Sequence, residues 1–398
     1  MASNTHLRRS NMKSRLAALV STLLLLSACS DTPTAASDYH NDVLTAAASK
    51  AAKAAQPASA VRWNAMALSL FRARGGNPGR SSAYLTLAQY RAALAATDAR
   101  HGQTRPSPAG AVAGASVVIL KQFYPLDAAA IDAELAAQRA VPPFGKEHNL
   151  DFEAGEAMGR TIGVAMLGYA AGDNFGRTSP GLPPGTPNTW TSSGAPIVRG
   201  GFGARPFFLT SGSELRPSAP PPFGSPAFLT AIAEVRTIAL SRTAAQTAIA
   251  QKWIPFSAPY FNAIANDLIE KYNSSELEAA RILAYANVAA FDAIIACFDT
   301  KFAFWFIRPT QADPSIPLAP GVPLPNHPSF PAAHSCETGA FHGVLADAFP
   351  RERAMLDAVA QEASISRVYG GIHYRFDGEA GLVIGESAAR LALQRGLE

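Results

Sequence analysis

Three short motifs in the last quarter of the 398-residue chain constrain its fold more than any other feature. They are residues 301–309 (KFAFWFIRP), 327–335 (HPSFPAAHS) and 366–377 (SRVYGGIHYRFD). Together they hold one lysine, three arginines and three histidines, next to many aromatic and apolar residues. Because a cation in a core-like segment needs an anion, the motifs predict a fold that gathers them around a tetrahedral oxyanion.

The order and spacing of these motifs resemble those of a known superfamily. The matching residues are Lys301, Arg308, Pro309, Pro331, Ala332, Ala333, His334, Ser366, Arg367, His373 and Asp377. The pattern is similar to that of the vanadium-dependent haloperoxidases and type 2 phosphatidic acid phosphatases (PAP2), and of their soluble bacterial haloperoxidase-like branch. Two positions depart from it, because Ala332 and Ala333 stand where the family usually has Ser and Gly.

The resemblance implies a catalytic site with an oxyanion cofactor. The groups that would hold vanadate, or phosphate in an alternative reaction, are Lys301, Arg308, Arg367, His373 and the backbone N–H of Ala333. His373 would bind the vanadium axially, oriented by Asp377, and His334 would act as acid or base. Guanidinium groups suit such a site because their planar donors match the oxygens of an oxyanion.

The same residues fit more than one function. An exported vanadate-dependent haloperoxidase-like enzyme would oxidise halide with hydrogen peroxide. An exported acid phosphatase would cleave a phosphate monoester through a phosphohistidine at His373, with His334 protonating the leaving alcohol. A non-catalytic oxyanion-binding lipoprotein is a third hypothesis, and its only support is Ala332, which lacks the family's hydroxyl group.

Two features favour the haloperoxidase over the phosphatase. The chain shows no apolar run of about 20 residues, whereas the membrane phosphatases of the superfamily have several spanning helices. His327 lies seven residues before His334, where halide-oxidising relatives carry a histidine or an aromatic residue. The resemblance therefore places His327 in the vicinity of the halide, and packing of its ring against the nearby prolines is the alternative.

The N-terminus predicts export. Residues 1–28 combine four basic residues with an apolar run that is too short to span a bilayer, which is typical of a signal peptide. Cys29 ends a Leu-Ser-Ala-Cys sequence that resembles a bacterial lipobox, so we expect lipidation at Cys29, a tether over 29–60 and a periplasmic or cell-envelope lipoprotein. The signal carries the whole net charge of +4, so the mature chain has no basic surplus for nucleic acid.

The body of the chain, residues 61–398, predicts one all-α catalytic domain with a helical-bundle core. Ala-rich amphipathic patterns favour helices over the segments 61–74, 83–97, 127–140, 153–171 and 226–248. Between them, residues 172–226 are rich in Pro, Gly, Ser and Thr and predict a long coil-rich excursion. Its aromatic residues favour packing over the active site, and a disordered surface loop is the alternative.

Local signals predict how the motifs sit on helices. Ser275 and Glu278 form a capping box that opens the helix leading into the first motif. Lys301 and Arg308 are two turns apart, so a helix ending near Pro309 would carry both on one face. The two cysteines that follow the signal, Cys297 and Cys336, are expected as buried free thiols, although export also permits a disulfide.

The second and third motifs predict helix starts. Pro331 suits the first turn of a helix over 332–349, which places His334 at the positive end of its dipole. His373 and Asp377 are four residues apart and would meet on one helical face. A carboxylate on one imidazole nitrogen would leave the other nitrogen to act as ligand or nucleophile.

Overall fold

The computed structural model describes residues 57–99, 105–140, 150–192, 194–198, 201–255 and 257–397. The predicted signal peptide, the lipidation site Cys29 and the tether up to residue 56 lie outside the described residues. The first described helix, α2, begins at Ser59, two residues before the position that the sequence predicts.

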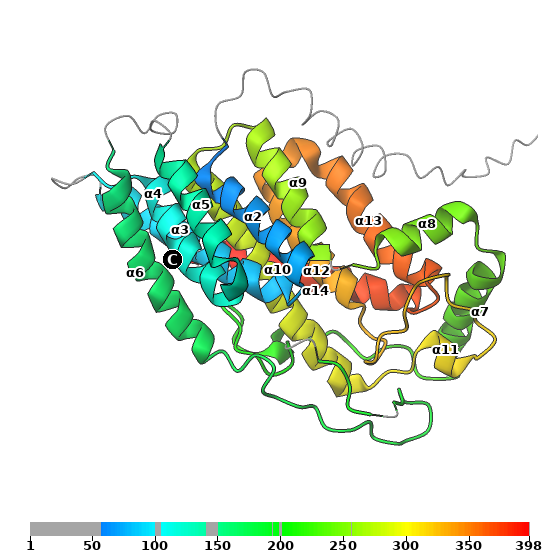
Figure 1. The fold of residues 1–398 in the computed structure, drawn as a ribbon. Helices are drawn as coiled ribbons and strands as arrows, with labels where there is room; N and C mark the ends of the chain where they lie inside the picture. The colour runs from blue at the N-terminus through cyan, green and yellow to red at the C-terminus, as the bar shows by residue number, and fades with distance from the viewer. Residues whose placement is uncertain are drawn as a thin grey trace, which may run out of the picture. The chain divides into compact units, whose positions relative to one another are not determined.

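Helices dominate the described residues, which contain no β-strand beyond two isolated bridges (Figure 1). The all-α prediction is therefore confirmed. The main helices are α2 (Ser59–Arg74), α3 (Pro78–Asp98), α4 (Pro108–Phe123), α5 (Ala128–Ala140), α6 (Phe152–Ala171), α7 (Pro226–Ser241), α8 (Ala244–Lys252), α9 (Ser257–Lys271), α10 (Glu276–Phe304), α11 (Pro309–Ala312), α12 (Ala333–Ala348), α13 (Arg353–Tyr369) and α14 (Arg375–Arg395).

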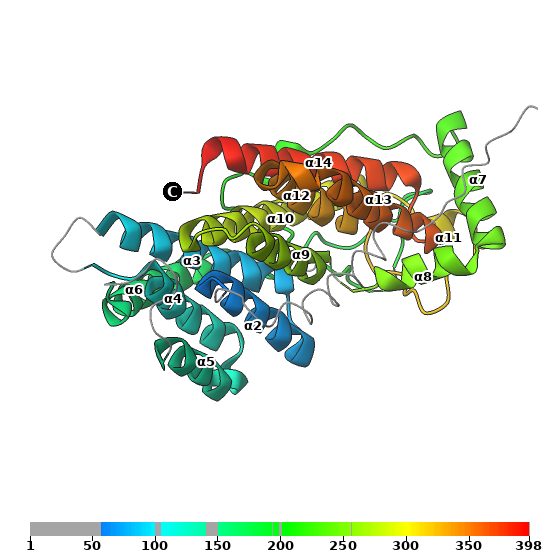
Figure 2. The same cartoon turned by 90° about the horizontal axis from the view of Figure 1, so that it is seen from above.

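Helix α10 is the centre of the bundle and packs against α2, α3, α9, α12 and α14 (Figure 2). Ser275 and Glu278 form the predicted capping box at its start. By length and composition α10 could cross a membrane, which corrects the expectation that the chain has no such stretch. However, 83% of its apolar window is buried inside the protein, as expected for a core helix.

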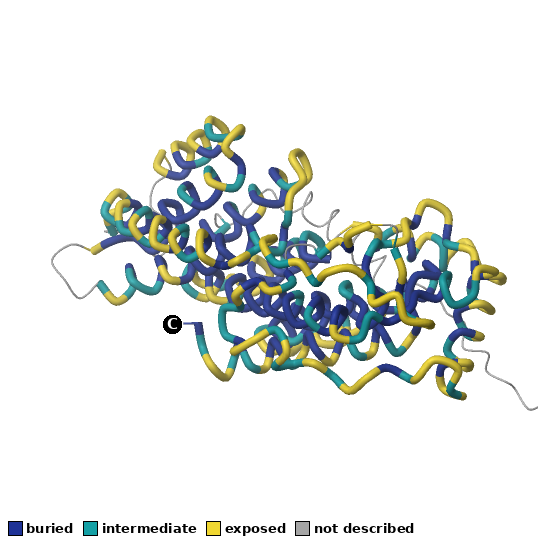
Figure 3. The backbone as a smooth tube through the Cα atoms, turned by 90° about the horizontal axis from the view of Figure 1, so that it is seen from below, coloured by how far each residue is buried: buried dark blue, intermediate teal, exposed yellow. Residues whose placement is uncertain are grey.

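Several helices differ from the sequence prediction, and α9 and α13, like α4, were not predicted. The pattern over 226–248 is split into α7 and α8, because Thr243 opens a new helix with a capping box that it forms with Gln246. Helix α4 was not predicted at all, because it is apolar on all sides and has no polar face to reveal its period. Figure 3 shows buried backbone in the interior of the bundle and exposed backbone at its periphery.

Two helix pairs, α4–α6 and α12–α14, approach each other unusually closely. A methyl group added at Gly114 or Gly159 would lie less than 3.0 Å from the backbone of the facing helix in the first pair, and one at Gly381 or Gly385 would do so in the second. Glycine therefore allows the backbones of both pairs to come together.

The excursion between α6 and α7 packs against the bundle instead of extending from it. Trp190 is only 2% exposed and stacks on Trp305, with ring centroids 6.0 Å apart. The backbone N–H of Ile197 donates to the carbonyl of Asn326, which directly precedes His327. The excursion thus braces the second motif, as the packing hypothesis predicted.

Candidate active site

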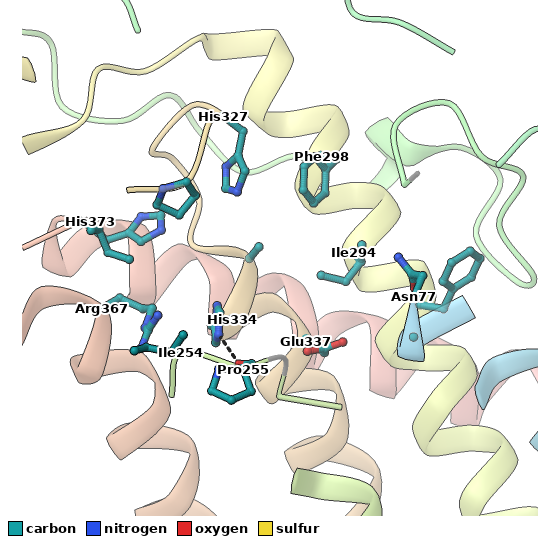
Figure 4. Close-up of a pocket in the computed structure, with 15 residues that line it drawn as sticks. Asn77, Ile254, Pro255, Ile294, Phe298, His327, His334, Glu337, Arg367 and His373 are labelled. Atoms are coloured by element: carbon teal, nitrogen blue, oxygen red, sulfur yellow. Dashed lines mark hydrogen bonds between the residues drawn. The ribbon is translucent and has the colours of Figure 1, made fainter. Parts of the chain in front are cut away.

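The motifs meet at a cavity of about 140 Å³ (Figure 4). It is lined by Asn77, Gly79, Ile254, Pro255, Phe291, Ile294, Phe298, Pro325, His327, Ala333, His334, Glu337, Arg367, Ile372 and His373. Seven of these lie in or between the second and third motifs. The rest come from α10, the start of α3, the α8–α9 connection and the segment just before the second motif. Lys301 and Arg308 do not line the cavity and contact its walls from behind.

His373 and Asp377 are in contact, although not on one helical face as predicted. His373 precedes α14, whose first turn contains Asp377, and the Nδ1–Oδ2 distance is 2.9 Å. Oδ2 of Asp377 also accepts hydrogen bonds from Ser329 Oγ at 2.5 Å and from the backbone N–H of Tyr374 at 3.1 Å. The carboxylate can only accept from an imidazole N–H, so Nδ1 carries the proton and Nε2 keeps its lone pair.

The first motif does not form the continuous helix that the sequence predicts. Helix α10 ends at Phe304, because Trp305 adopts a left-handed conformation with φ 48° and donates its N–H to Lys301 O. Arg308 therefore lies in extended chain beyond the helix, and Pro309 begins α11 instead of ending α10. The two cations approach the site from different local structures.

Arg308 is fully buried behind the two site imidazoles. Its Nη1 lies 3.1 Å from His373 Nε2, and its Nη2 lies 3.1 Å from His327 Nδ1. Its Nε donates to the carbonyl of His327 at 3.0 Å, and Nη1 donates to that of Ile372 at 2.6 Å. The guanidinium thus covers the one nitrogen of His373 that could ligate or attack a central atom.

Lys301 is also fully buried, and backbone oxygens surround its ammonium group. Nζ donates to the carbonyls of Pro328 at 2.8 Å and Ser329 at 2.9 Å, and to that of Pro331. These three bonds match the three protons of the ammonium group. In this structure Lys301 fixes the second motif and contributes positive charge from behind the cavity wall.

Arg367 is the cation that lines the cavity directly. It lies in the last turn of α13, and its side chain donates to Ser366 Oγ at 2.9 Å and to Ala250 O at 3.1 Å. Its Nη1 group has no hydrogen-bond partner among the described residues. Arg367 therefore has donors available for an oxyanion.

The three cations of the site are buried, and no carboxylate of the described residues forms an ion pair with them. Among the described residues, none of Lys301, Arg308 and Arg367 has a carboxylate oxygen within 4.0 Å. Burial lowers the pKa of Lys301 to about 8, of Arg308 to about 9 and of Arg367 to about 10. Burial, followed by the charge of Arg308, lowers the pKa of His373 well below its usual range, so its ring is neutral.

His334 lies in the first turn of α12, as the sequence predicts, and is half-buried at the cavity. Its Nε2 lies 3.0 Å from the carbonyl of Pro255. Because a carbonyl only accepts, Nε2 carries a proton and Nδ1 is the basic nitrogen of the neutral ring. Ala333 also lines the cavity, at the positive end of the helix dipole.

Pro331 precedes α12 and does not belong to its first turn, contrary to the prediction. The Phe330–Pro331 peptide bond is cis, and Ala332 occupies the N-cap position without a side-chain cap. The side chain of Ala332 is fully buried, and its backbone N–H donates to the carbonyl of Asp377 at 2.9 Å. This bond joins the starts of α12 and α14.

Two polar residues near the site were not identified from the sequence. Ser329, within the second motif, positions the carboxylate of Asp377. Glu337 lies one turn after His334, is 5% exposed and lines the cavity. It accepts hydrogen bonds from Ser257 Oγ at 2.6 Å and from the N–H of Ala258 at 3.1 Å. Its spacing of three residues from His334 was the available signal.

The other predicted residues are placed as follows. His327 lines the cavity beside Phe298, with ring centroids 5.4 Å apart in an edge-to-face arrangement. It contacts Arg308 as well as its neighbour Pro328, so it both packs and faces the cavity. Cys297 and Cys336 are buried free thiols, as preferred from the sequence.

Comparison with known proteins agrees with this architecture. A bacterial vanadium-dependent iodoperoxidase superposes with a TM-score of 0.70 at 20% identity, over 86% of this chain and 98% of the other. Apo and holo forms of a bacterial vanadium-dependent chloroperoxidase give TM-scores of 0.63 and 0.61 at 13% identity, over 80% of this chain and 93% and 91% of theirs. No curated protein sequence matches this chain significantly.

The fold is thus that of the all-helical bundles found in vanadium-dependent haloperoxidases. Residues 281–396, which contain all three motifs, match the model of the PAP2 superfamily. This C-terminal part of the chain thus matches the PAP2 superfamily, as its motifs predicted.

Proposed function

We propose that this chain is a haloperoxidase-type enzyme that holds vanadate and oxidises halide with hydrogen peroxide. One observation carries the proposal: Lys301, Arg308 and Arg367 are buried beside two histidines, and no carboxylate of the described residues pairs with them. Burying three such cations costs several kcal/mol each unless an anion compensates them. A bound oxyanion would supply that compensation.

The donor set fits vanadate. Arg367 offers Nη1 at the cavity, and the first turn of α12 at Ala333 adds the positive end of a helix dipole. His373 presents a neutral ring whose Nε2 lone pair can bind the central atom, because Nδ1 donates to Asp377. An oxyanion would compete with Nε2 for Arg308, and the guanidinium would have to leave the imidazole.

When bound, vanadate would supply an electrophilic centre that activates hydrogen peroxide towards halide. In the overall reaction the halide loses two electrons to the peroxide, and with one proton the products are hypohalous acid and water. His334 would move the proton through Nδ1, while the carbonyl of Pro255 holds its Nε2–H. His327, at the cavity wall, would lie in the halide's vicinity.

A phosphatase is the second candidate, and the match to the PAP2 superfamily model favours it. In this reaction Nε2 of His373 would attack phosphorus, and the bond to the leaving alcohol would break. His334 would protonate the leaving oxygen, and water would then hydrolyse the phosphohistidine. The same buried cations would stabilise the charge on the phosphoryl oxygens.

One experiment separates the two candidates. The purified protein is assayed, with and without vanadate, for bromination in the presence of peroxide and for hydrolysis of p-nitrophenyl phosphate. We expect bromination only with vanadate, and inhibition of that activity by phosphate. Hydrolysis without vanadate, together with no bromination, would favour the phosphatase, and neither activity would favour a non-catalytic oxyanion-binding protein.

We also propose that the protein is exported and anchored through a lipid on Cys29, which is its only expected contact with a membrane. The lipobox-like sequence that ends at Cys29 supports this proposal. Metabolic labelling with a radioactive fatty acid tests it in bacteria that express the chain. Label should be incorporated into the wild type and be absent from Cys29→Ser.

A further inference from the structure

One turn of α12 holds the start of α9 at two points. His334 Nε2 donates to the carbonyl of Pro255 at 3.0 Å, a bond that Figure 4 draws as a dashed line. Three residues further along α12, the carboxylate of Glu337 accepts hydrogen bonds from Ser257 Oγ at 2.6 Å and from the backbone N–H of Ala258 at 3.1 Å. Because residues three apart are neighbours on a helix surface, both contacts reach the same short segment.

The contacts of Glu337 with α9 are buried. Glu337 is 5% exposed, and Ser257 and Ala258 are fully buried. A buried carboxylate needs hydrogen-bond donors, and the N–H groups at a helix start are donors that the helix itself does not use. The positive end of the α9 dipole favours the carboxylate there as well. Glu337 therefore fixes the first turn of α9 relative to α12.

The chain before Pro255 is held at its other end. Trp253 Nε1 and Lys252 Nζ both donate to Oε1 of Glu362, on α13, at 2.9 and 2.7 Å. The proline ring itself restricts the φ angle at Pro255 to a narrow range. The carbonyl of Pro255 thus lies between two held ends, and one of these ends is fastened to α12, the helix that carries His334.

The place of the Pro255 carbonyl decides which nitrogen of His334 is basic. A carbonyl only accepts, so it keeps the proton on Nε2 and leaves the lone pair on Nδ1. If the carbonyl moved away, the neutral ring would exchange between its two tautomers, because the tautomer of an imidazole is set by its hydrogen-bond partner. Nδ1 would then be basic for only part of the time.

We propose that Glu337 is a positioning residue for His334. It holds the start of α9, so that the Pro255 carbonyl stays on Nε2 and Nδ1 remains the basic nitrogen at the cavity. The inference rests on the proposed function only in treating His334 as the acid or base of turnover. Both candidate reactions move a proton on this ring, so the inference does not depend on which of them the enzyme performs.

Glu276 offers a matched control. Its carboxylate, on α10, accepts hydrogen bonds from the backbone N–H groups of Ser59 and Ala60 at 2.7 and 2.8 Å. It thus holds the start of α2 as Glu337 holds the start of α9, and it does not line the cavity. Glu276→Ala removes bonds of the same kind without touching His334 or its carbonyl partner.

The first measurement is the tautomer of His334, read from the nitrogen-15 chemical shifts of its ring in the full chain at a pH where imidazole is neutral. We expect one well-separated pair of shifts, for protonated Nε2 and bare Nδ1, in the wild type and in Glu276→Ala. In Glu337→Ala the two shifts should move towards each other. Glu337→Gln should resemble the wild type, since an amide oxygen can accept the same two hydrogen bonds.

The second measurement is steady-state turnover. Glu337→Ala should lower kcat by about ten-fold, because a misdirected catalytic group loses part of its contribution. Its vanadate affinity, from isothermal titration, should remain that of the wild type, since Arg367 and His373 are unchanged. Glu337→Gln and Glu276→Ala should keep the kcat of the wild type. Ser257→Ala removes one of the two bonds from the α9 side and serves as a milder variant in case Glu337→Ala does not fold.

A lower melting temperature in Glu337→Ala and Ser257→Ala, with the wild-type ring shifts and kcat, would mean that Glu337 only caps α9, and it would overturn the proposal. A loss in Glu337→Gln as large as in Glu337→Ala would also overturn it, because the charge and not the hydrogen bonds would then matter. If the wild type shows neither bromination nor phosphate hydrolysis, the proposed function fails, and the ring shifts still decide the role of Glu337.

Discussion

The helix pairs α4–α6 and α12–α14 are joined in the same way, yet only the second has a helix start at the cavity. In both pairs glycine allows the backbones to touch, and a backbone hydrogen bond links the two helix starts. In α4–α6 that bond runs from Ser107 N–H to Asp151 O at 2.9 Å. In α12–α14 it runs from Ala332 N–H to Asp377 O at the same distance.

The difference lies in how each helix start is capped. Ser107 and Asp151 cap their own helices with side-chain oxygens, so the first pair satisfies its donors internally. Helix α12 has no side-chain cap, and the carboxylate of Asp377 orients His373 as well as capping α14. Close packing is therefore sufficient to join two helices. A binding site also needs a helix start whose backbone N–H groups are not capped by a side chain, as in α12.

The largest expected effect comes from the histidine that precedes α14. His373→Ala removes the imidazole nitrogen that would bind vanadium or attack phosphorus, and it should abolish turnover and vanadate binding, whichever reaction the enzyme performs. Asp151→Ala is the matched change at α6 and removes a cap worth about 1 kcal/mol without touching the cavity. Its turnover should equal that of the wild type at a temperature where both are folded. Full activity in His373→Ala would contradict the claim that only the α12–α14 pair has a helix start at the active site.

His334→Ala should slow turnover by about 10²–10⁴-fold, the usual contribution of a positioned acid or base. Vanadate affinity should largely persist, because Arg367, Arg308 and His373 are unchanged. Steady-state kinetics and isothermal titration measure the two quantities separately. A parallel loss of affinity would mean that the ring is itself needed for binding.

Glycine substitutions compare the two interfaces directly. Gly159→Ala and Gly385→Ala each place a methyl group against a facing backbone, and each should lower the free energy of unfolding by about 1–3 kcal/mol. Only Gly385→Ala should also weaken vanadate binding by the folded protein, since it shifts α14 against α12. Urea denaturation gives the free energy of unfolding. Isothermal titration of vanadate, at a temperature below the unfolding transition, gives the affinity of the folded protein. Equal affinities in the two variants would contradict this account.

The cap that α12 lacks can be supplied. Ala332→Ser should tighten vanadate or phosphate binding by about 0.5–1.5 kcal/mol if its hydroxyl donates to the oxyanion. If the hydroxyl instead caps α12, the variant should melt at a higher temperature without any oxyanion, the reverse of the loss expected for Ser107→Ala. Isothermal titration of vanadate into the wild type and Ala332→Ser measures the change in affinity. Equal or weaker affinity in the variant would mean that the pocket differs from the one that the family motif implies.

A pH effect on stability is expected outside both pairs, at Asp292 of α10. Asp292 is fully buried on α10 and accepts backbone hydrogen bonds from Phe207, Phe208 and Leu209, and burial raises its pKa to about 7. A carboxyl with a folded pKa above its unfolded value of about 3.9 contributes stability at low pH, and this contribution declines until pH reaches about 7. Urea denaturation at pH 5 and pH 8 should reveal the decline in the wild type, whereas Asp292→Asn should lack this contribution.

The sequence was sufficient to predict those features of the fold and the site that depend on local pattern and on the order of the motifs. The capping box of α10, the all-α class and the place of His334 in the first turn of α12 followed from short-range signals. It was not sufficient where tertiary contacts override the local pattern. Seven-residue spacing predicted Lys301 and Arg308 on one helix, but packing around Trp305 turns the chain at that point.

Long-range partners could not be read from the sequence either. The contact between Ser329 and Asp377, and the carbonyls that surround Lys301, depend on how the second motif folds back onto α10. Helix α4 lacked a signal because it is buried on all sides. Motif spacing therefore predicted which residues gather, and the structure adds that Lys301 and Arg308 stand behind the cavity wall.

The central claim is that Arg308, Arg367 and His373, with the positive charge of Lys301 behind them, hold one oxyanion. A crystal structure of the protein soaked with vanadate tests it most directly, because vanadium is readily located by its anomalous scattering. The account predicts one vanadium atom bonded to Nε2 of His373, with its oxygens on Arg367 and on an Arg308 that has left the imidazole. Vanadium bound elsewhere, or His373 still covered by Arg308 at saturating vanadate, would contradict it.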